Sequence, residues 1–346
     1  MSTYYATYFG LLFAVMLGTQ GPRLQTGLYW GLLVGLFVFS GYRYEVGCDW
    51  TGYLYNWTIW DPRYTNPIIQ GDPAHWAVIN FLKSNGFSYP SLNVVTSAIF
   101  FLGLHVLARK QPNPLAFLVL AFPILIINMP MSGIRQGAAI GFVSMAFVAF
   151  STGRPLVFAA LVGMGSLFHS SAMIFFLLVP FVLGRYTRKN LLLAGMLALP
   201  GVYFLLQSDQ VELATQRYLD LNVDAAGAPF RLALISLTGL GYFIFLKKRW
   251  EQRFPEDFKL ASLGALMMIC FFGLFFVSTV IGDRFGYYLI PIQLMIFARI
   301  PYLFRGHVGT LFSITPYAVL TAVFIIWTQV SWLFQQCYLP YDSVLF

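Results

Sequence analysis

Apolar runs separated by short polar segments dominate the chain. Many of these runs reach, or approach, the roughly 17–25 residues that an α-helix needs to cross a bilayer. The predicted helices cover about residues 4–20, 25–42, 91–108, 115–130, 133–152, 155–168, 170–184, 190–206, 229–246, 260–281, 286–303 and 310–334. The pattern therefore predicts an all-α, polytopic integral membrane protein with about twelve transmembrane helices, two of them short enough to be tilted or re-entrant.

Composition agrees with this pattern. The chain has 346 residues, of which 58% are hydrophobic and only 10% are charged, whereas a soluble domain carries about 25% charged residues. No polar tract is long enough for a separate soluble domain. We expect a single membrane domain over residues 1–346, with longer outer-face segments at about 43–90 and 207–228.

The distribution of charge predicts the orientation. If both termini lie outside, the inner loops hold 14 of the 21 basic residues but only 3 of the 13 acids. This separation is what the positive-inside rule requires. The net charge of +8 is thus explained by topology. Membrane lipids are therefore expected as partners, and nucleic acid is not.

Several kinds of chemistry lack their sequence signals. The three cysteines show neither CxxC nor Cys/His spacing, so we expect no metal site and no disulfide framework. The first 20 residues lack a basic n-region, which favours a retained first helix over a cleaved signal peptide. No P-loop, Rossmann, HExxH or GxSxG motif occurs in a supporting context. A transferase of this kind would use an energy-rich, lipid-linked donor on the outer side and no cofactor.

Arg135 and Gln136 begin the predicted helix at 133–152, in the stretch SGIRQGAA. The small residues around them would let a ligand or another helix approach closely. A helix N-terminus favours anions, and an arginine there can hold phosphate with two hydrogen bonds. The alternative is an arginine that anchors the helix at the membrane interface.

Two other polar positions have similar pairs of interpretations. His169, in GSLFHSS, is either a structural histidine or a group that binds phosphate or acts as a general base. Asp283 and Arg284 form either a local salt bridge at a helix end or, through Arg284, a second phosphate clamp with Tyr287 or Tyr288 bonding the substrate.

The first outer segment interleaves charged and aromatic residues in YRYEVGCDWTGYLYNW. This pattern is typical of an aromatic belt, or of a sugar site in which rings stack on pyranoses and an acid activates an acceptor hydroxyl. The candidate acids are Asp49 and Glu45 of this segment, or a distant outer acid such as Asp220. Farther on, GDPAHWAVINFLKSNG predicts a surface helix capped by Asp72, with Trp76, Ile79 and Leu82 against lipid.

Four of these elements, in order, resemble the EpsG/Wzy-type membrane polysaccharide polymerases. They match an Arg-x-x-x-Gly-x-Asp-aromatic-x-x-Tyr element, an Arg-Gln-x-x-Ala segment, a Phe-His-x-Ser-Ala element and an Arg-x-x-x-Tyr motif. The matching residues are Arg43, Gly47, Asp49, Trp50, Tyr53, Arg135, Gln136, Ala139, Phe168, His169, Ser171, Ala172, Arg284 and Tyr288. Cys48 and Trp50 depart from the commoner Thr or Ser and Tyr.

The resemblance implies polymerisation of undecaprenyl-pyrophosphate-linked oligosaccharide repeats at the periplasmic face of the bacterial inner membrane, without a metal. It implies Asp49, His169 and Arg135 as catalytic candidates. Arg43, Arg135, Gln136, Arg284, Tyr288, Tyr53 and Trp50 would bind the pyrophosphate or the sugar. A chain-length regulator and a flippase of the same pathway are the expected protein partners. The products would be O-antigen, capsule or exopolysaccharide.

The rival functions are an O-antigen ligase, which would use the same donor, and a lipid-linked oligosaccharide flippase or other transporter. A transporter would need polar residues along a central path in mid-helix, whereas the charges here gather near helix ends. A purely structural subunit would tolerate replacement of every residue named above.

Overall fold

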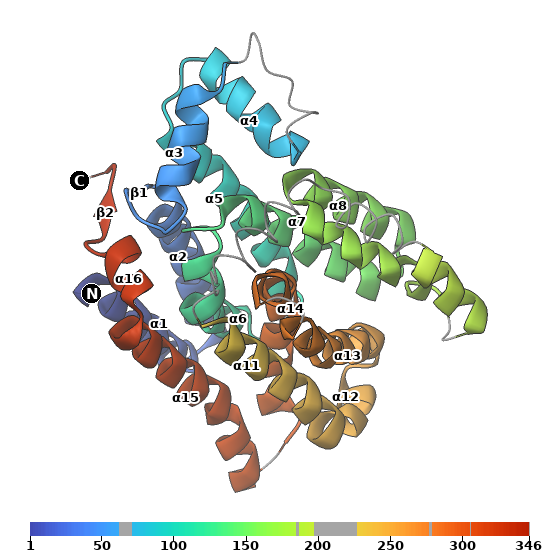
Figure 1. Cartoon of the computed structure of the whole chain (residues 1–346). Coiled ribbons are helices and arrows are strands. Elements are labelled where there is room, and N and C mark those ends of the chain that lie inside the picture. The colour runs from blue at the N-terminus through green and yellow to red at the C-terminus, as the bar shows by residue number, and fades with distance from the viewer. Residues whose placement is uncertain (62–70, 185–186, 197–226, 277–278, 305, 346) are drawn as a thin grey trace. The chain divides into compact units, whose positions relative to one another are not determined.

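The computed structural model describes residues 1–346 except 62–70, 185–186, 197–226, 277–278, 305 and 346 (Figure 1). The elements are α1 (Ser2–Gly18), α2 (Pro22–Gly41), β1 (Arg43–Tyr44), α3 (Trp50–Ile59), α4 (Pro73–Ser84), α5 (Pro90–Ala108), α6 (Pro114–Ala121), η1 (Phe122–Ile126), α7 (Ile134–Ser151), α8 (Pro155–Phe168), η2 (Ser170–Phe181), α11 (Ala228–Gly241), η4 (Tyr242–Leu246), α12 (Lys247–Arg253), η5 (Pro255–Asp257), α13 (Phe258–Phe275), α14 (Thr279–Arg299), η6 (Ile300–Tyr302), α15 (Gly306–Val330), α16 (Trp332–Tyr338) and β2 (Asp342–Ser343).

The described residues confirm the all-α class. Six helices among them are long and apolar enough to cross a membrane, and shorter apolar helices cover Pro114–Ile126, Pro155–Phe168 and Ser170–Phe181. The expected twelve spans and the orientation of the termini stay predictions. Most of the predicted run at 190–206, most of the segment 207–228, and Asp220 lie outside the described residues.

The chain forms two compact units. The first comprises Met1–Phe142, Leu167–His169 and Phe297–Phe346; the second comprises Val143–Ser166 and Ser170–Ile296. The single membrane domain over residues 1–346 stays a prediction.

Glycines bring the helices of the first unit into close contact. A Cβ atom on Gly103 of α5 would lie 1.9 Å from the carbonyl oxygen of Gly141 on α7. Small residues permit such close packing of membrane helices, where no hydrophobic effect drives association. Elsewhere in the unit, α1 pairs with α15 through Tyr5–Thr328 and Tyr8–Thr321 hydroxyl contacts of 2.7 and 2.9 Å.

Helices α3 and α4 stand together beside the N-terminal end of α5 (Figure 1). The helix predicted from GDPAHW is α4, with Pro73 at its first position. The prediction that Trp76, Ile79 and Leu82 face lipid is wrong. All three are less than 9% exposed and belong to a cluster with the aromatic rings of α3. Their helical spacing marks a buried face equally well, and the sequence alone did not reveal the partner helix.

Residues 337–344 are tied to the segment that follows α2. Strands β1 and β2 pair antiparallel, with Arg43 opposite Ser343. A disulfide joins Cys48 to Cys337, and the amide of Gly47 donates to the carbonyl of Cys337 over 2.7 Å. The expectation of no disulfide is therefore wrong. It rested on spacing, but the partners are 289 residues apart and meet only through tertiary structure.

The second unit is also built on close helix contacts. Helix α11 lies along α13, where a Cβ on Gly239 would be 2.5 Å from the carbonyl oxygen of Ala265. Helix α14 begins at Thr279, earlier than the residue 286 predicted. Asp283 and Arg284 therefore lie within a helix and not at its end.

The Gly103 contact predicts a matched pair of stabilities. Gly103→Ala would force α5 and α7 apart and cost about 1–3 kcal/mol, as overpacking does. Gly31→Ala on α2 meets nothing within 4 Å and should leave stability unchanged or slightly raised. Thermal unfolding of the two purified variants in one detergent tests this, and equal melting temperatures would contradict the close approach.

The disulfide predicts a thiol count. Because Cys270 is the free cysteine, maleimide should label one of the three cysteines in protein unfolded in detergent without reduction, and all three after reduction. Reduction should also lower the free energy of unfolding by about 2–4 kcal/mol. Three labelled thiols without reduction would be the contrary result, and Cys270→Ser gives the zero point.

Candidate functional site

The first of the four sequence motifs, at residues 43–53, packs against the turn that precedes α7. Gly47 has a φ of +108°, and a Cβ there would lie 1.9 Å from the carbonyl oxygen of Met131. Only glycine suits both the left-handed backbone and this approach. The next contact comes from the amide of Asp49, which donates to Ser132 Oγ over 3.3 Å. The motif segment 43–49 and the start of α7 are thus held as one structure.

Arg43 is the first residue of this segment, and its side chain is only 1% exposed. Its Nε donates to the carbonyl of Val46 over 3.0 Å and its Nη1 to that of Ser40 over 2.6 Å. Its Nη2 donates to Asn93 Oδ1 on α5 over 3.0 Å. Burial lowers the pKa of Arg43 to about 10, and nearby tyrosines, Tyr89 first, oppose the shift. Arg43 joins α2, α5 and the motif segment, and has no exposed surface for a substrate.

Arg135 occupies a different environment. It sits in the first turn of α7, and its side chain is 35% exposed. Nη1 donates to Asp72 Oδ2 over 2.8 Å, and the guanidinium carbon lies 5.7 Å from the centre of the Tyr53 ring. A partly exposed guanidinium that lies beside an aromatic ring and bonds a carboxylate through one nitrogen can bind an anion.

Tyr53 and His75 form the inner wall beside Arg135. Their ring centres are 5.7 Å apart, and both side chains are buried, Tyr53 to 7% and His75 to 1% exposure. Burial raises the pKa of Tyr53, which the Arg135 guanidinium opposes and the Asp49 carboxylate reinforces. Burial, and then Arg135, lower the pKa of His75 well below its usual value. The imidazole is therefore neutral at physiological pH.

The remaining candidates of the first unit are less directly grouped. Asp49 is exposed at the start of α3. Trp50 is 5% exposed within the aromatic cluster, 4.8 Å from the ring of Tyr89, so its faces are covered by protein. Gln136 is buried beside Arg135. His169 follows α8 and is half-buried, and its neighbour Phe168 stacks on Phe142 of α7 at 5.6 Å.

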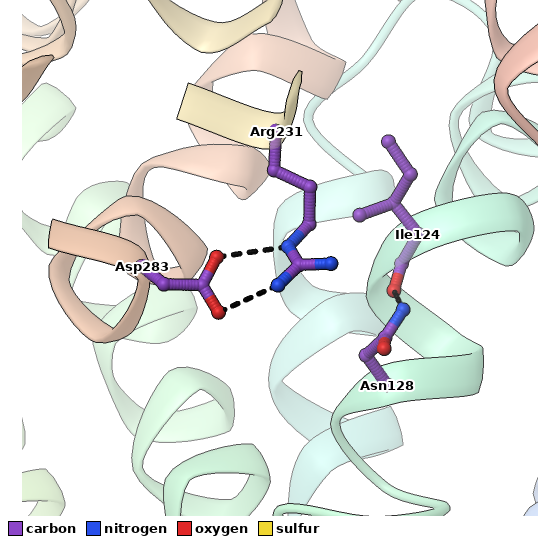
Figure 2. Close-up of polar contacts among 4 residues, drawn as sticks. All are labelled: Ile124, Asn128, Arg231 and Asp283. Carbon is purple, nitrogen blue, oxygen red and sulfur yellow. Dashed lines mark hydrogen bonds and ion pairs between the residues drawn. The ribbon is translucent and has the colours of Figure 1, made fainter. Parts of the chain in front are cut away.

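Arg284 and Tyr288 belong to the second unit. Arg284 is exposed on α14, whereas Tyr288 is 0% exposed and accepts a hydrogen bond from Ser171 Oγ over 3.1 Å. The sequence suggested a local salt bridge between Asp283 and Arg284, but in the structure Asp283 forms an ion pair with Arg231. Arg231 of α11 donates to both oxygens of Asp283 over 2.8 Å, as Figure 2 shows.

Sequence reasoning missed three residues that contribute to these arrangements. Asp72 was assigned only to helix capping, and His75 and Arg231 were not singled out. A signal existed for Arg231, because it is one of the basic residues that the predicted topology places outside, against the positive-inside bias. No group of three or more His, Cys, Asp or Glu that could hold a metal occurs among the residues that the structure describes.

The model of the EpsG family matches residues 28–343, nearly the whole chain. Neither a curated protein nor a solved structure matches significantly. The family match supports, in broad terms, a role of the polysaccharide-polymerase type, and together with the apolar helices it indicates a multi-pass membrane protein.

The contact of Gly47 with Met131 predicts a second matched pair. Gly47→Ala would place a methyl group against the Met131 carbonyl and strain a left-handed backbone, which costs about 1–2 kcal/mol on its own. Segment 43–49 should shift, and Cys48 should lose its alignment with Cys337. Gly52→Ala on α3 meets nothing within 4 Å. Maleimide labelling of Cys48 should rise in the first variant and not in the second; equal labelling would contradict the contact.

Proposed function

The chain belongs to the EpsG family, and from this we propose that it is a polysaccharide polymerase that joins undecaprenyl-pyrophosphate-linked oligosaccharide repeats at the periplasmic face of the inner membrane. The growing chain passes from its lipid carrier to a hydroxyl of an incoming lipid-linked unit. The product is O-antigen, capsule or exopolysaccharide.

The accessible Arg135 carries this proposal. Its guanidinium is the group of the first unit best suited to bind the donor pyrophosphate, because it is 35% exposed at the start of a helix. Fixed donors aimed at a leaving pyrophosphate stabilise the charge that develops there, which a metal does in other transferases. Gln136 assists from the same turn. Arg284 on α14, in the second unit, stays a candidate phosphate-binding residue on the strength of its sequence motif alone.

The transfer itself needs an acid-base group. The acceptor oxygen forms a bond to the anomeric carbon, the bond from that carbon to the pyrophosphate oxygen breaks, and the acceptor hydroxyl loses its proton. We assign this proton to Asp49, which is exposed beside the Arg135 site, and we keep His169 as an assisting group.

The buried members of the motifs receive positioning roles in this proposal. Arg43 and Tyr288 have their polar atoms engaged within the protein, and Trp50 and Tyr53 belong to the aromatic cluster under the site. They hold the segments that carry Asp49, Arg135 and Arg284.

The disulfide supports the proposed side of the membrane. Disulfides persist in oxidising compartments such as the periplasm and are rare in the cytosol. Because Cys48 and Cys337 are bonded, segment 43–49 and the Arg135 site beside it would face the periplasm.

The surface-glycan ladder of a deletion strain tests the function. Wild type should restore the full ladder, whereas Arg135→Ala should leave single repeats, since loss of one donor to a developing anion slows a reaction about 10²–10³-fold. Arg135→Lys should restore part of it, because lysine keeps the charge and loses the planar fork.

The control for this experiment is Arg23→Ala, which removes an exposed arginine at the start of α2 and should behave as wild type. If the deletion removes all attached sugar, a ligase or flippase is favoured instead. An unchanged ladder with Arg135→Ala would overturn the assigned role of Arg135.

A further inference from the structure

Asp72 lies at the start of α4, where an aspartate usually caps its own helix. The carboxylate makes no such capping hydrogen bond and instead contacts Arg135 Nη1. The residue also has a φ of +48°, in the left-handed region that non-glycine residues seldom adopt. The local backbone therefore turns Asp72 away from its ordinary role and toward Arg135.

The contact between Asp72 and Arg135 differs from the ion pair between Arg231 and Asp283. Arg231 and Asp283 share two hydrogen bonds, and their side chains are 13% and 14% exposed. Asp72 reaches Arg135 through one terminal nitrogen, and the arginine is 35% exposed. The Arg231–Asp283 pair therefore uses both carboxylate oxygens, whereas the Asp72–Arg135 contact leaves part of the guanidinium exposed to another anion.

Two buried polar atoms, one of Arg135 itself and one of its neighbour His75, lack a hydrogen-bond partner among the described residues. They are Arg135 Nε and His75 Nδ1. His75 is neutral, because burial lowers its pKa, so it adds hydrogen-bonding capacity without positive charge. Arg135 thus supplies the attraction for an anion at this point, and Asp72 neutralises it while the site is empty.

We propose that the Asp72 carboxylate competes with the substrate pyrophosphate for Arg135. It holds the guanidinium before the pyrophosphate binds and returns to it as the spent carrier leaves. The inference rests on the proposed function, since it takes the ligand to be a polyprenyl pyrophosphate. A pyrophosphate offers more charge and more acceptor oxygens than one carboxylate and displaces it. After transfer, the waiting carboxylate weakens the hold on undecaprenyl pyrophosphate.

The test is the affinity of the full-length protein, in lipid nanodiscs, for undecaprenyl pyrophosphate, measured by quenching of tryptophan fluorescence. Asp72→Asn should bind about two- to tenfold more tightly than wild type, because the competing ion pair is gone. Asp72→Gly should do the same, and it suits the left-handed backbone, so a folding defect does not explain the result. Arg135→Ala should bind much more weakly.

The control for bulk charge is Glu256→Gln. It removes one negative charge from an exposed position in the connector before α13 and should bind as wild type. Tightening by this variant equal to that of Asp72→Asn would overturn the proposal, because the effect would then be nonspecific attraction.

The other outcomes separate the inference from the function. If Asp72→Asn and Asp72→Gly bind more weakly than wild type or equally, while Arg135→Ala loses binding, then Asp72 merely supports Arg135 and the competitor role is wrong. The assignment of Arg135 to the pyrophosphate would survive that result. If Arg135→Ala binds as wild type does, both fail together.

Discussion

The buried guanidinium of Arg43 is the interaction on which the first unit depends. A charged group removed from water is costly unless its hydrogen bonds are replaced, and here carbonyl and amide oxygens from three segments replace them. The end of α2, the motif segment and α5 are therefore fixed relative to one another. The Gly47 contact with Met131 then extends this frame to the start of α7, where Arg135 lies.

Arg43, Arg231 and Arg135 lie in three different environments. Arg43 is enclosed and satisfied by neutral oxygens, and Arg231 is locked to Asp283 by two bonds. Arg135 has one bond to a carboxylate and a substantial exposed surface. Since the three side chains are chemically identical, accessibility and the number of fixed partners decide which of them can bind a substrate.

The helical class and several helices could be predicted because apolar periodicity is a local signal. The helices at Pro90–Ala108 and Ile134–Ser151 agree closely with the predicted runs. Features that need a distant partner could not be predicted. The spacing of Trp76, Ile79 and Leu82 shows a buried face but not whether lipid or α3 covers it. The bond of Cys48 to Cys337 spans 289 residues.

The candidate site likewise combines residues that sequence motifs predict with features that depend on tertiary contacts. Motif order indicated Arg135 and Asp49, and these are held near one another through Ser132. Which arginine is accessible could not be read from the sequence, because burial depends on tertiary contacts. Asp72 was visible as a helix start, but its contact with Arg135 depends on a left-handed backbone that the residue type permits and does not require.

The tie between segments 43–49 and 337–344 has a consequence for biogenesis. The motif segment is synthesised early, yet its disulfide and strand partners arrive nearly 300 residues later. A nascent chain inserted into the membrane helix by helix therefore carries an incomplete site until those residues have emerged. The placement of segment 43–49 is therefore complete only in molecules whose synthesis has passed residue 344.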